Sequence, residues 1–231
     1  MSNLILVSVI ITNYNYGHFL ARAIRSCIQQ SLSEESYEII VIDDNSTDHS
    51  RAIIDNFGKH VKPIFNEKQM GIAYCSNVGI KHSHGIYVIR VDSDDYINFK
   101  TLEILMMFLN QNPTYAYAYC DHLLVNEDEG REHRVFMNDE ETLMNHGAGI
   151  MFKKSAIEAV GLYDEEMMNC EDMVLLKTLK LHGYKGLHVR LPLYRYLRHG
   201  ANMTEDREAR KKWAILAEEK IEKHKNSIHK L

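Results

Sequence analysis

Along the first 112 positions, short apolar runs alternate with longer stretches in which apolar residues recur at helical spacing. Short runs such as residues 37–42 are almost wholly apolar, as expected of a strand that is covered on both faces. Between these runs, apolar residues recur three and four positions apart, which is typical of helices with one buried face. This alternation predicts a parallel sheet with helices on both faces. The predicted strands span residues 7–12, 37–42, 61–65 and 85–91, and the predicted helices span residues 18–30, 46–57, 72–82 and 99–109.

The pattern after residue 112 is more mixed. It predicts strands over residues 115–125, 134–137 and 149–152, and helices over residues 155–160 and 171–182. The charged tail carries Trp213, Leu216, Ala217 and Ile221 on one stripe, which predicts an amphipathic helix. We therefore expect one α/β domain over residues 1–204 and a C-terminal helical extension over residues 205–231.

The composition supports a folded globular domain and excludes some functional classes. The 231 residues are 45% hydrophobic, and 3 prolines and 12 glycines are too few for a disordered chain. The formal net charge is −5, with both signs mixed along the chain, so the chain has no overall basic field to hold nucleic acid. We therefore expect no nucleic-acid partner.

The cysteine spacing and the residues of the N-terminus indicate the cellular compartment of the protein. No two of the four cysteines form the C-x-x-C pair of zinc and redox sites, and unpaired thiols are typical of a reducing compartment. The apolar residues 4–11 lack the basic start and the small-residue cleavage site of a signal peptide. No apolar run reaches the ~18–20 residues that cross a bilayer. We expect a cytoplasmic protein, and a peripheral membrane contact stays open.

Polar and acidic residues follow three of the predicted strands where each strand ends. Residues 12–15 follow the first strand, Asp43 and Asp44 follow the second, and residues 92–95 follow the fourth. Ligands of open parallel sheets bind outside the carboxyl ends of the strands. We therefore expect these residues to share one rim of the sheet.

The acidic segment Asp92-Ser93-Asp94-Asp95 is the main chemical clue. Carboxylates this close repel one another, and a hard divalent cation among them relieves the repulsion. Mg²⁺ or Mn²⁺ fits, because proteins hold such ions with one or two carboxylates and substrate phosphates. A solvated turn or a helix cap is the alternative for so short a motif. An EF-hand loop is not expected, since Tyr96 and Ile97 replace a calcium ligand and the required glycine.

The second and first strand ends suggest a nucleoside site. The carboxylate of Asp44 is suited to accept hydrogen bonds from a base N–H or a ribose hydroxyl. Asp43 or Asp48 is suited to cap the helix that follows, so the roles are divided among these residues. Tyr14 offers a ring for base stacking, with ordinary packing as the alternative.

Two later segments carry further chemistry. Glu171 and Asp172 open a predicted helix, where the helix dipole favours an ionised carboxylate that can take a proton from an alcohol. Plain capping charge is the alternative. Arg198 and His199 follow, a guanidinium that can neutralise a diphosphate and an imidazole that can ligate a metal. The alternative for them is a surface loop with ordinary charges.

These residues, in this order, resemble the inverting family 2 glycosyltransferases, which have the GT-A fold. The resemblance spans nearly all of residues 7–204 and rests on an ordered set of short motifs rather than on any one of them. The matching segments are residues 9–15, 38–48, 71–73 with Asn77 and Gly79, 85–95, 161–165, 171–172 and 196–204.

The resemblance implies a role for each candidate. Asp172 would be the catalytic general base. Asp44 would bind the base of the nucleotide, and Arg198 would contact the diphosphate. The nucleotide-binding residues would be Thr12, Tyr14, Asp44, Asp92 and Arg198, and the metal ligands would be Asp94, Asp95 and His199.

The resemblance also implies the reaction. A sugar would pass from a nucleotide diphosphate donor, with UDP favoured, to a hydroxyl of a sugar or lipid-linked glycan acceptor, with inversion. Mn²⁺ or Mg²⁺ would stabilise the departing nucleotide diphosphate. Residues 1–112 would form the nucleotide-binding half and residues 113–204 the acceptor-side half, within cell-surface polysaccharide or glycoconjugate synthesis.

Two residues depart from the common pattern of this family. Asn45 stands where many relatives carry glycine, and Asn is among the few other residues that tolerate a left-handed backbone. Arg90 stands ahead of the acidic segment where an aliphatic residue is common, and it is placed to pair with a carboxylate.

Other functions stay open at this point. A non-catalytic nucleotide-sugar-binding subunit is one alternative. A sugar-phosphate nucleotidyltransferase is a weaker one, since it needs a Gly-rich loop with Arg or Lys after the first strand, and residues 12–18 have a single Gly and no Arg or Lys. The C-terminal helix is expected to be a lid over the acceptor side, a homodimer contact or a membrane-surface contact.

Overall fold

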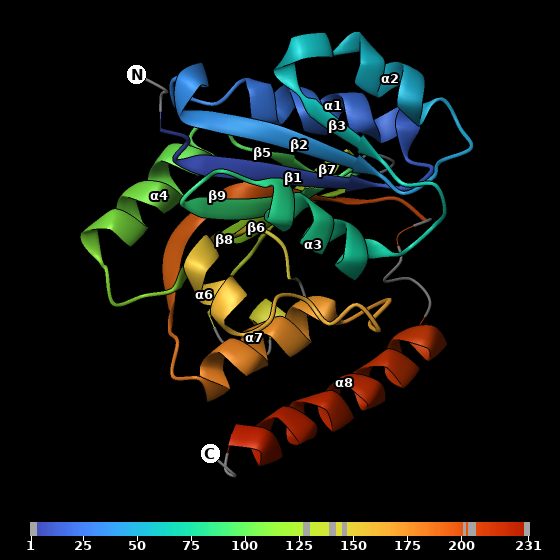
Figure 1. The fold of residues 1–231 in the computed structure, drawn as a ribbon. Coiled ribbons are helices and arrows are strands. Elements are labelled where there is room, and N and C mark those ends of the chain that lie inside the picture. The colour runs from blue at the N-terminus through green and yellow to red at the C-terminus, as the bar shows by residue number, and fades with distance from the viewer. Residues whose placement is uncertain are drawn as a thin grey trace.

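The computed structural model of the chain describes residues 4–126, 130–138, 142–144, 147–200, 202 and 207–228. These residues form a central sheet with helices on both faces, as the sequence predicts (Figure 1). The strands are β1 (Val7–Asn13), β2 (Tyr37–Asp43), β3 (Lys62–Phe65), β4 (Tyr87–Asp92), β5 (Tyr96–Ile97), β6 (Tyr117–Asn126), β7 (Arg131–Val135), β8 (Ile150–Lys153) and β9 (Gly186–Arg198). The α-helices are α1 (Gly17–Ile28), α2 (Ser50–Asn56), α3 (Ile72–His82), α4 (Thr101–Gln111), α6 (Lys154–Ala159), α7 (Glu171–Leu181) and α8 (Arg207–Ile228).

The first four strands form the predicted parallel half of the sheet. Strand β1 lies between β2 and β4 and is parallel to both, and β3 is parallel to β2. Helices α1, α2 and α3 connect these strands in the predicted order, and α3 begins and ends at the predicted residues. Parallel strands need such helical crossovers, which is why the alternating pattern was informative.

The second half of the sheet mixes directions. Strand β8 is antiparallel to β4 and β6, and β9 is parallel to β6. Strand β5 is antiparallel to β9, and β7 is antiparallel to β6. Strands β5 and β9 are not among the strands predicted from the apolar pattern. Residues 187–191 of β9 alternate apolar and polar side chains as a half-buried strand does, but Pro192 and the irregular pairing with β6 at Asp121 interrupt this alternation. Arg195 and Arg198 therefore end a strand and do not lie in a surface loop.

The core has one layer on each face of the sheet. Alternate residues of a strand point to opposite faces, and β1 follows this rule. Val9 and Ile11 pack with Leu20 of α1 and with Leu105 of α4. Ile10 points to the other face, where it belongs to the cluster that includes residues of α3, α6 and α7. The loops at the strand ends are thus carried on a sheet that is covered on both sides.

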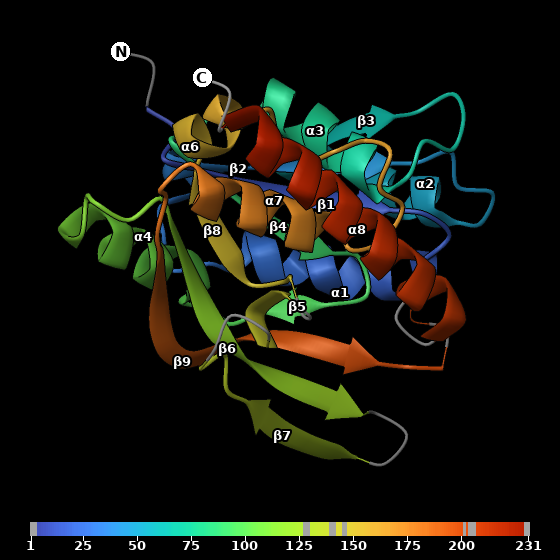
Figure 2. The same ribbon diagram turned by 90° about the horizontal axis from the view of Figure 1, so that it is seen from below.

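Helix α8 covers α7 on the outer side of the molecule (Figure 2). Trp213, Leu216 and Ala217 of the predicted stripe pack against Val174, which confirms the stripe. An ion pair between Lys177 and Glu218, 3.0 Å long, also joins the two helices. Among the described helices, none is long and apolar enough to cross a membrane. Residues 201, 203–206 and 229–231 of the predicted motif and helix lie outside the described residues.

The four cysteines are free thiols, as expected of a reduced chain. Cys27, Cys75 and Cys120 are buried, and Cys170 is half-buried. Burial raises the pKa of the thiols of Cys27 and Cys120 to about 12. These two cysteines therefore behave as core side chains.

Candidate active site

A cleft opens where β1, β2 and β4 end. Asn13 of β1 lies opposite Asp43 of β2, and Thr12 lies opposite Asp92 of β4, so the three strand ends reach the same edge of the sheet. The cleft has a volume of about 880 Å³. Seven of the nine predicted site residues line it, namely Thr12, Tyr14, Asp44, Asp92, Asp94, Asp172 and Arg198.

Asp44 organises the part of the cleft that borders residues 66–71. Its Oδ1 accepts a hydrogen bond from Asn66 Nδ2 at 2.7 Å, and its Oδ2 accepts one from the amide of Gly71 at 2.8 Å. The amide of Met70 donates to both oxygens. The carboxylate thus holds residues 66–71 against the cleft. Tyr14 is 38% exposed beside it and presents its ring to the opening.

The loops after β1 and β2 are locked to each other by short polar side chains. Asn15 Oδ1 accepts from the amide of Thr47 at 2.8 Å, and Asp48 accepts from the amides of Gly17 and Ser50, each at 2.9 Å. Asp48 therefore accepts hydrogen bonds from the first amide of α1 and the first amide of α2, although His49 and not Asp48 occupies the N-cap position of α2. Asn45 has a φ of 63°, the left-handed conformation that the sequence predicted for this position.

Asp94 lies between the strand-end loop and the last described segment before α8. Its Oδ2 lies 3.0 Å from Nε2 of His199 and 3.3 Å from Nδ2 of Asn202. Burial and the charge of Asp92 raise the pKa of Asp94, against the opposing effect of His199. Asp94 and His199 are 105 residues apart in the chain, yet their side chains lie within hydrogen-bond distance of each other.

Asp94 and His199 could hold a divalent cation, because carboxylate oxygen and imidazole nitrogen are ligands of Mn²⁺. The described residues contain no group of three or more His, Cys, Asp or Glu side chains placed to hold a metal. Two protein ligands are nevertheless enough when substrate phosphates supply the remaining oxygens, which is the usual arrangement for Mg²⁺. The donor set therefore fits a cation that binds together with a diphosphate.

Asp95 and His199 are not among the described residues that line the cleft. Asp95 is only 1% exposed, and both of its oxygens are occupied. Oδ1 accepts from the amide of Leu197 and Oδ2 from the hydroxyl of Tyr194, each at 2.8 Å. These contacts fasten the acidic loop to β9. Asp95 therefore holds in place the loop that carries Asp94.

Asp172 lies across the cleft, in the first turn of α7. Its side chain is 13% exposed, with Oδ2 2.6 Å from Nη2 of Arg90 and Oδ1 3.1 Å from the hydroxyl of Tyr163. Burial raises the pKa of Asp172 to about 8, against the lowering effect of Arg90. The position of Asp172 at the start of α7 favours an ionised carboxylate, whereas burial and the charges of Glu171 and Asp92 raise its pKa.

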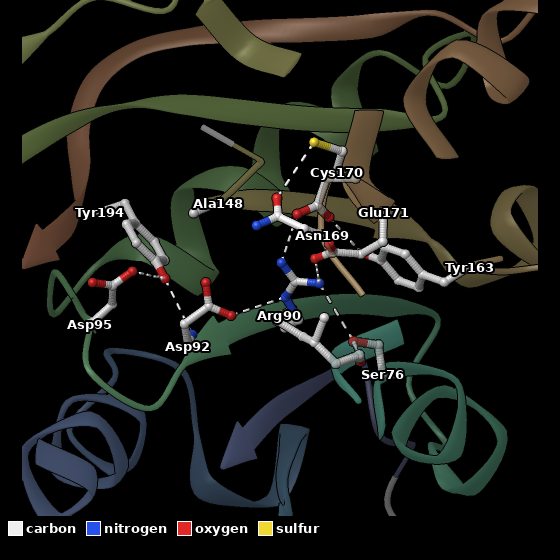
Figure 3. Close-up of polar contacts among 12 residues, drawn as sticks. Ser76, Arg90, Asp92, Asp95, Ala148, Tyr163, Asn169, Cys170, Glu171 and Tyr194 are labelled. Carbon is white, nitrogen blue, oxygen red and sulfur yellow. Dashed lines mark hydrogen bonds and ion pairs between the residues drawn. The ribbon is translucent and has the colours of Figure 1, made fainter. Parts of the chain in front are cut away.

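Some cleft residues were missed by the sequence analysis or given no role there. Arg90 was noted as a departure able to pair with a carboxylate; it pairs with Asp172 and with Glu171, beside which Figure 3 shows it. Asn202 was quoted in a motif without a role, yet it contacts Asp94. Arg210 and Ala214 of α8 line the cleft; a lid over this side was one of three roles expected for the helix, but neither residue was singled out. The signal for Arg90 was a charged residue inside a buried strand.

The cleft brings three kinds of groups together. Tyr14 and Asp44 offer a ring and hydrogen-bond acceptors, Asp94 and Arg198 offer opposite charges, and Asp172 offers a carboxyl group with a pKa of about 8. A carboxyl group with such a pKa is able to take up a proton near neutral pH. The cleft is therefore equipped to bind a nucleoside diphosphate compound and to deprotonate a hydroxyl beside it.

Comparison with known proteins agrees with this description. The sequence profile described as Glycosyl transferase family 2 matches residues 8–161. An uncharacterized glycosyltransferase of Nostoc sp. is 41% identical over 216 residues, which cover 85% of this chain and 66% of the relative. An uncharacterized glycosyltransferase of Haemophilus influenzae is 38% identical over 126 residues, or 52% of this chain and 50% of the relative. The chain therefore spans half to two thirds of these relatives.

Solved structures share the fold at low sequence identity. TarS of S. aureus, in a complex with UDP-GlcNAc, matches 87% of this chain and 61% of its own, with a TM-score of 0.76 and 20% identity. The mannosyltransferase PcManGT of Pyrobaculum calidifontis, in a complex with GDP-Man and Mn²⁺, matches 82% of this chain and 56% of its own. Its TM-score is 0.66 at 17% identity. These similarities establish a GT-A-like fold.

Proposed function

Because the chain belongs to glycosyl transferase family 2, we propose that it transfers a sugar from UDP to an acceptor hydroxyl with inversion and with the help of Mn²⁺ or Mg²⁺. One observation supports this proposal above the others. Asp44, Asp94 and Asp172 come from three distant segments and line one cleft. A set of carboxylates scattered over separate surfaces would have left the proposal without a site.

The donor would lie along the strand ends. Its base would stack beside Tyr14 and reach Asp44, and its ribose would reach Asp92. Arg198 would neutralise charge on the diphosphate, since a guanidinium is suited to phosphate oxygens. UDP is favoured by the family resemblance and by the UDP-GlcNAc complex of TarS.

The cation would be held by Asp94 and His199, whose side chains are 3.0 Å apart. When bound there, it would stabilise negative charge on the departing diphosphate. We propose that Asp95 does not ligate it, since Asp95 is 1% exposed, is not among the described residues that line the cleft, and has both oxygens engaged in hydrogen bonds. Asp95 would instead fix the position of Asp94, which follows from its contacts with Tyr194 and Leu197.

The transfer itself would take one step. Asp172 would accept the proton of the acceptor hydroxyl as the acceptor oxygen forms a bond to the anomeric carbon. The bond from that carbon to the diphosphate oxygen would break at the same time, and its electron pair would leave with UDP. Attack from the side opposite the leaving group inverts the anomeric centre. A pKa of about 8 suits Asp172 to this exchange near neutral pH.

The acceptor would enter from the side of α7 and α8. Cys170 and Met173 line this part of the cleft together with Arg210 and Ala214 of α8. We propose that α8 serves as a wall over the acceptor, which is one of the three roles expected from the sequence. A sugar or lipid-linked glycan acceptor, in cell-surface polysaccharide or glycoconjugate synthesis, is the setting that the family resemblance favours.

The test is release of UDP from a panel of UDP-sugars, with water or an added sugar as acceptor. We expect release with Mn²⁺ and none after chelation. Asp94→Ala should abolish both release and Mn²⁺-dependent binding of UDP. The control is Asp55→Asn, because Asp55 is exposed on α2, away from the residues that line the cleft.

Two results would contradict the proposal. Release of UDP that is unaffected by chelation would remove the role of the cation. Tight binding of UDP without release from any UDP-sugar, with a range of acceptors present, would instead indicate a non-catalytic nucleotide-sugar-binding subunit.

A further inference from the structure

Arg90 contacts three different carboxylates with its three guanidinium nitrogens. Nε lies 3.1 Å from Oδ1 of Asp92, Nη1 lies 3.0 Å from Oε1 of Glu171, and Nη2 lies 2.6 Å from Oδ2 of Asp172. Figure 3 shows its side chain reaching from β4 toward the start of α7. One side chain therefore joins the strand that ends in the acidic segment to the helix that carries Asp172.

The charges of this cluster are nearly enclosed. The side chain of Arg90 is 10% exposed and that of Glu171 is 7% exposed. Although burial lowers the pKa of Arg90, the charges of Asp172 and Asp92 raise it well above its ordinary value, so the guanidinium stays charged. A buried carboxylate without a partner is costly, and Arg90 provides the partner for both Glu171 and Asp172.

The side chain of Asp172 is also held on its other sides. The hydroxyl of Tyr163 donates to Oδ1 at 3.1 Å, and Tyr163 is itself fixed by Asn77, which bonds its amide at 3.0 Å and its carbonyl at 2.9 Å. Gly147 closes a third side, because a Cβ atom there would lie 2.7 Å from Cγ of Asp172. Arg90 is the member of this group that comes from the donor side of the cleft.

We propose that Arg90 is a positioning residue that fixes the base Asp172 relative to the donor diphosphate. This inference rests on the proposed function. Arg90 ties Asp172 to the strand that presents Asp92, so the attacking hydroxyl and the anomeric carbon are brought together at a set distance. After Asp172 takes up the proton, Glu171 and Asp92 still balance the guanidinium. Arg90 itself gives up no proton.

The shape of the guanidinium explains why a lysine at position 90 would not make the same contacts. Arginine presents its N–H donors in a fixed planar fork, whereas the lysine ammonium is a point charge on a flexible stem. Arg90→Lys therefore retains the charge but loses the simultaneous contact with three carboxylates. A displacement of about 1 Å at a reacting group can slow a reaction about 100-fold.

The experiment compares Arg90→Lys with Arg134→Lys, both with Mn²⁺ present. Arg134 is a matched control because it pairs with the buried Asp121 at 2.6 Å, outside the residues that line the cleft. Binding of UDP is measured by calorimetry, and UDP release from UDP-GlcNAc, UDP-galactose and UDP-glucose gives kcat and KM. We expect Arg90→Lys to lower kcat about 100-fold and to leave the Kd for UDP within about twofold. Arg134→Lys should leave both unchanged.

A double variant separates positioning of Asp172 from general support of the fold. If Arg90 acts through Asp172, then Arg90→Lys combined with Asp172→Asn is no slower than Asp172→Asn alone. If Arg90→Lys acted only through a loss of stability, it would instead lower kcat by the same factor in the parental protein and in Asp172→Asn. If Arg90→Lys does not fold, Arg90→Met with Glu171→Gln takes its place, since it removes the guanidinium and one buried charge together.

Each contrary result has its own meaning. A parental kcat in Arg90→Lys, or an additive loss in the double variant, overturns the role of Arg90 and leaves the proposed function standing. A large loss of UDP binding in Arg90→Lys also overturns it, because Arg90 would then act on the donor. Absence of UDP release from the parental protein contradicts the proposed function, and this inference falls with it.

Discussion

The two ends of the cleft hold their carboxylates in different ways. At the nucleoside end, Asp44 is surrounded by amide N–H donors from one nearby loop. At the acceptor end, Asp172 is held by the guanidinium of Arg90, which lies 82 residues away in the chain. The donors around Asp44 hold residues 66–71 against the cleft, whereas burial raises the pKa of Asp172 and so suits it to acid–base work.

This contrast separates binding from chemistry. Changes at the nucleoside end should alter the affinity for UDP, because they alter the loop that forms the pocket. Changes at the acceptor end should alter the rate of transfer while UDP still binds. Variants at the two ends therefore test whether the cleft is divided in this way.

The largest effect is expected from Asp172→Asn. The amide keeps the shape of the side chain but has no carboxylate to accept the proton, so transfer should fall by about 10²- to 10⁴-fold. The Kd for UDP with Mn²⁺ should stay within about twofold. Steady-state kinetics and calorimetry on the same preparation measure both, with Asp55→Asn as the control. Transfer at the parental rate would show that another group is the base.

Gly147→Ala should have the next largest effect. Gly147 has a φ of 54°, and a Cβ atom there would overlap the carboxylate of Asp172. We expect transfer to fall about 100-fold through displacement of Asp172, and stability to fall by ~1–2 kcal/mol through backbone strain. Steady-state kinetics and thermal unfolding measure the two losses separately.

The control for this variant is Gly58→Ala. Gly58 has a φ of 49°, and a Cβ atom there would meet no other atom within 4 Å, so the variant carries the strain without the overlap. It should lose similar stability in thermal unfolding and keep the parental kcat. Equal losses of kcat in the two variants would mean that strain, rather than contact with Asp172, sets the rate.

Asp44→Asn tests the nucleoside end. One amide N–H would then face the donors of residues 66–71, which leaves buried groups unpaired at a cost of about 1–3 kcal/mol. We expect the Kd for UDP, measured by calorimetry, to rise about tenfold or more, with kcat at saturating donor changed much less. A loss confined to kcat would erase the proposed difference between the two ends.

The smallest effect is expected from pH alone. Asp172 must be deprotonated to accept a proton, and its pKa is raised to about 8 by burial. The rate of transfer should therefore rise with pH, by roughly tenfold between about pH 7 and pH 9, and level off above the pKa. Asp172→Asn should lose this dependence. A parental rate that is flat from about pH 6 to pH 9 would argue against the raised pKa.

Much of the parallel half of the fold was readable from local patterns. The alternation of apolar runs and helical spacing gave β1 to β4 and α1 to α3, because each such element buries one characteristic set of residues. The strand ends followed, since parallel strands place their carboxyl ends on one edge. Asn45 was likewise predictable, because a left-handed backbone restricts the choice of residue at that one position.

Other features depended on contacts between distant segments. In β9 the alternation of apolar and polar residues is confined to residues 187–191 and stops at Pro192, so the full length of the strand depends on its pairing with β6 and β5. Asp94 and Asp95 are adjacent in the chain and equally acidic, yet Asp94 lines the cleft and Asp95 is buried beneath it. No local pattern distinguishes two neighbouring carboxylates, since their surroundings come from β9 and the segment after it.

The sequence by itself determined which chemical groups are present and which strand ends carry them, because propensity and periodicity act over a few residues. The tertiary structure alone decided which group neutralises which. The sequence shows Arg90 as a charged residue in a buried strand and does not identify its partner. The fold places Glu171 and Asp172 beside it. Charge pairing depends on distance in space, and that distance exists only once the sheet and α7 have packed together.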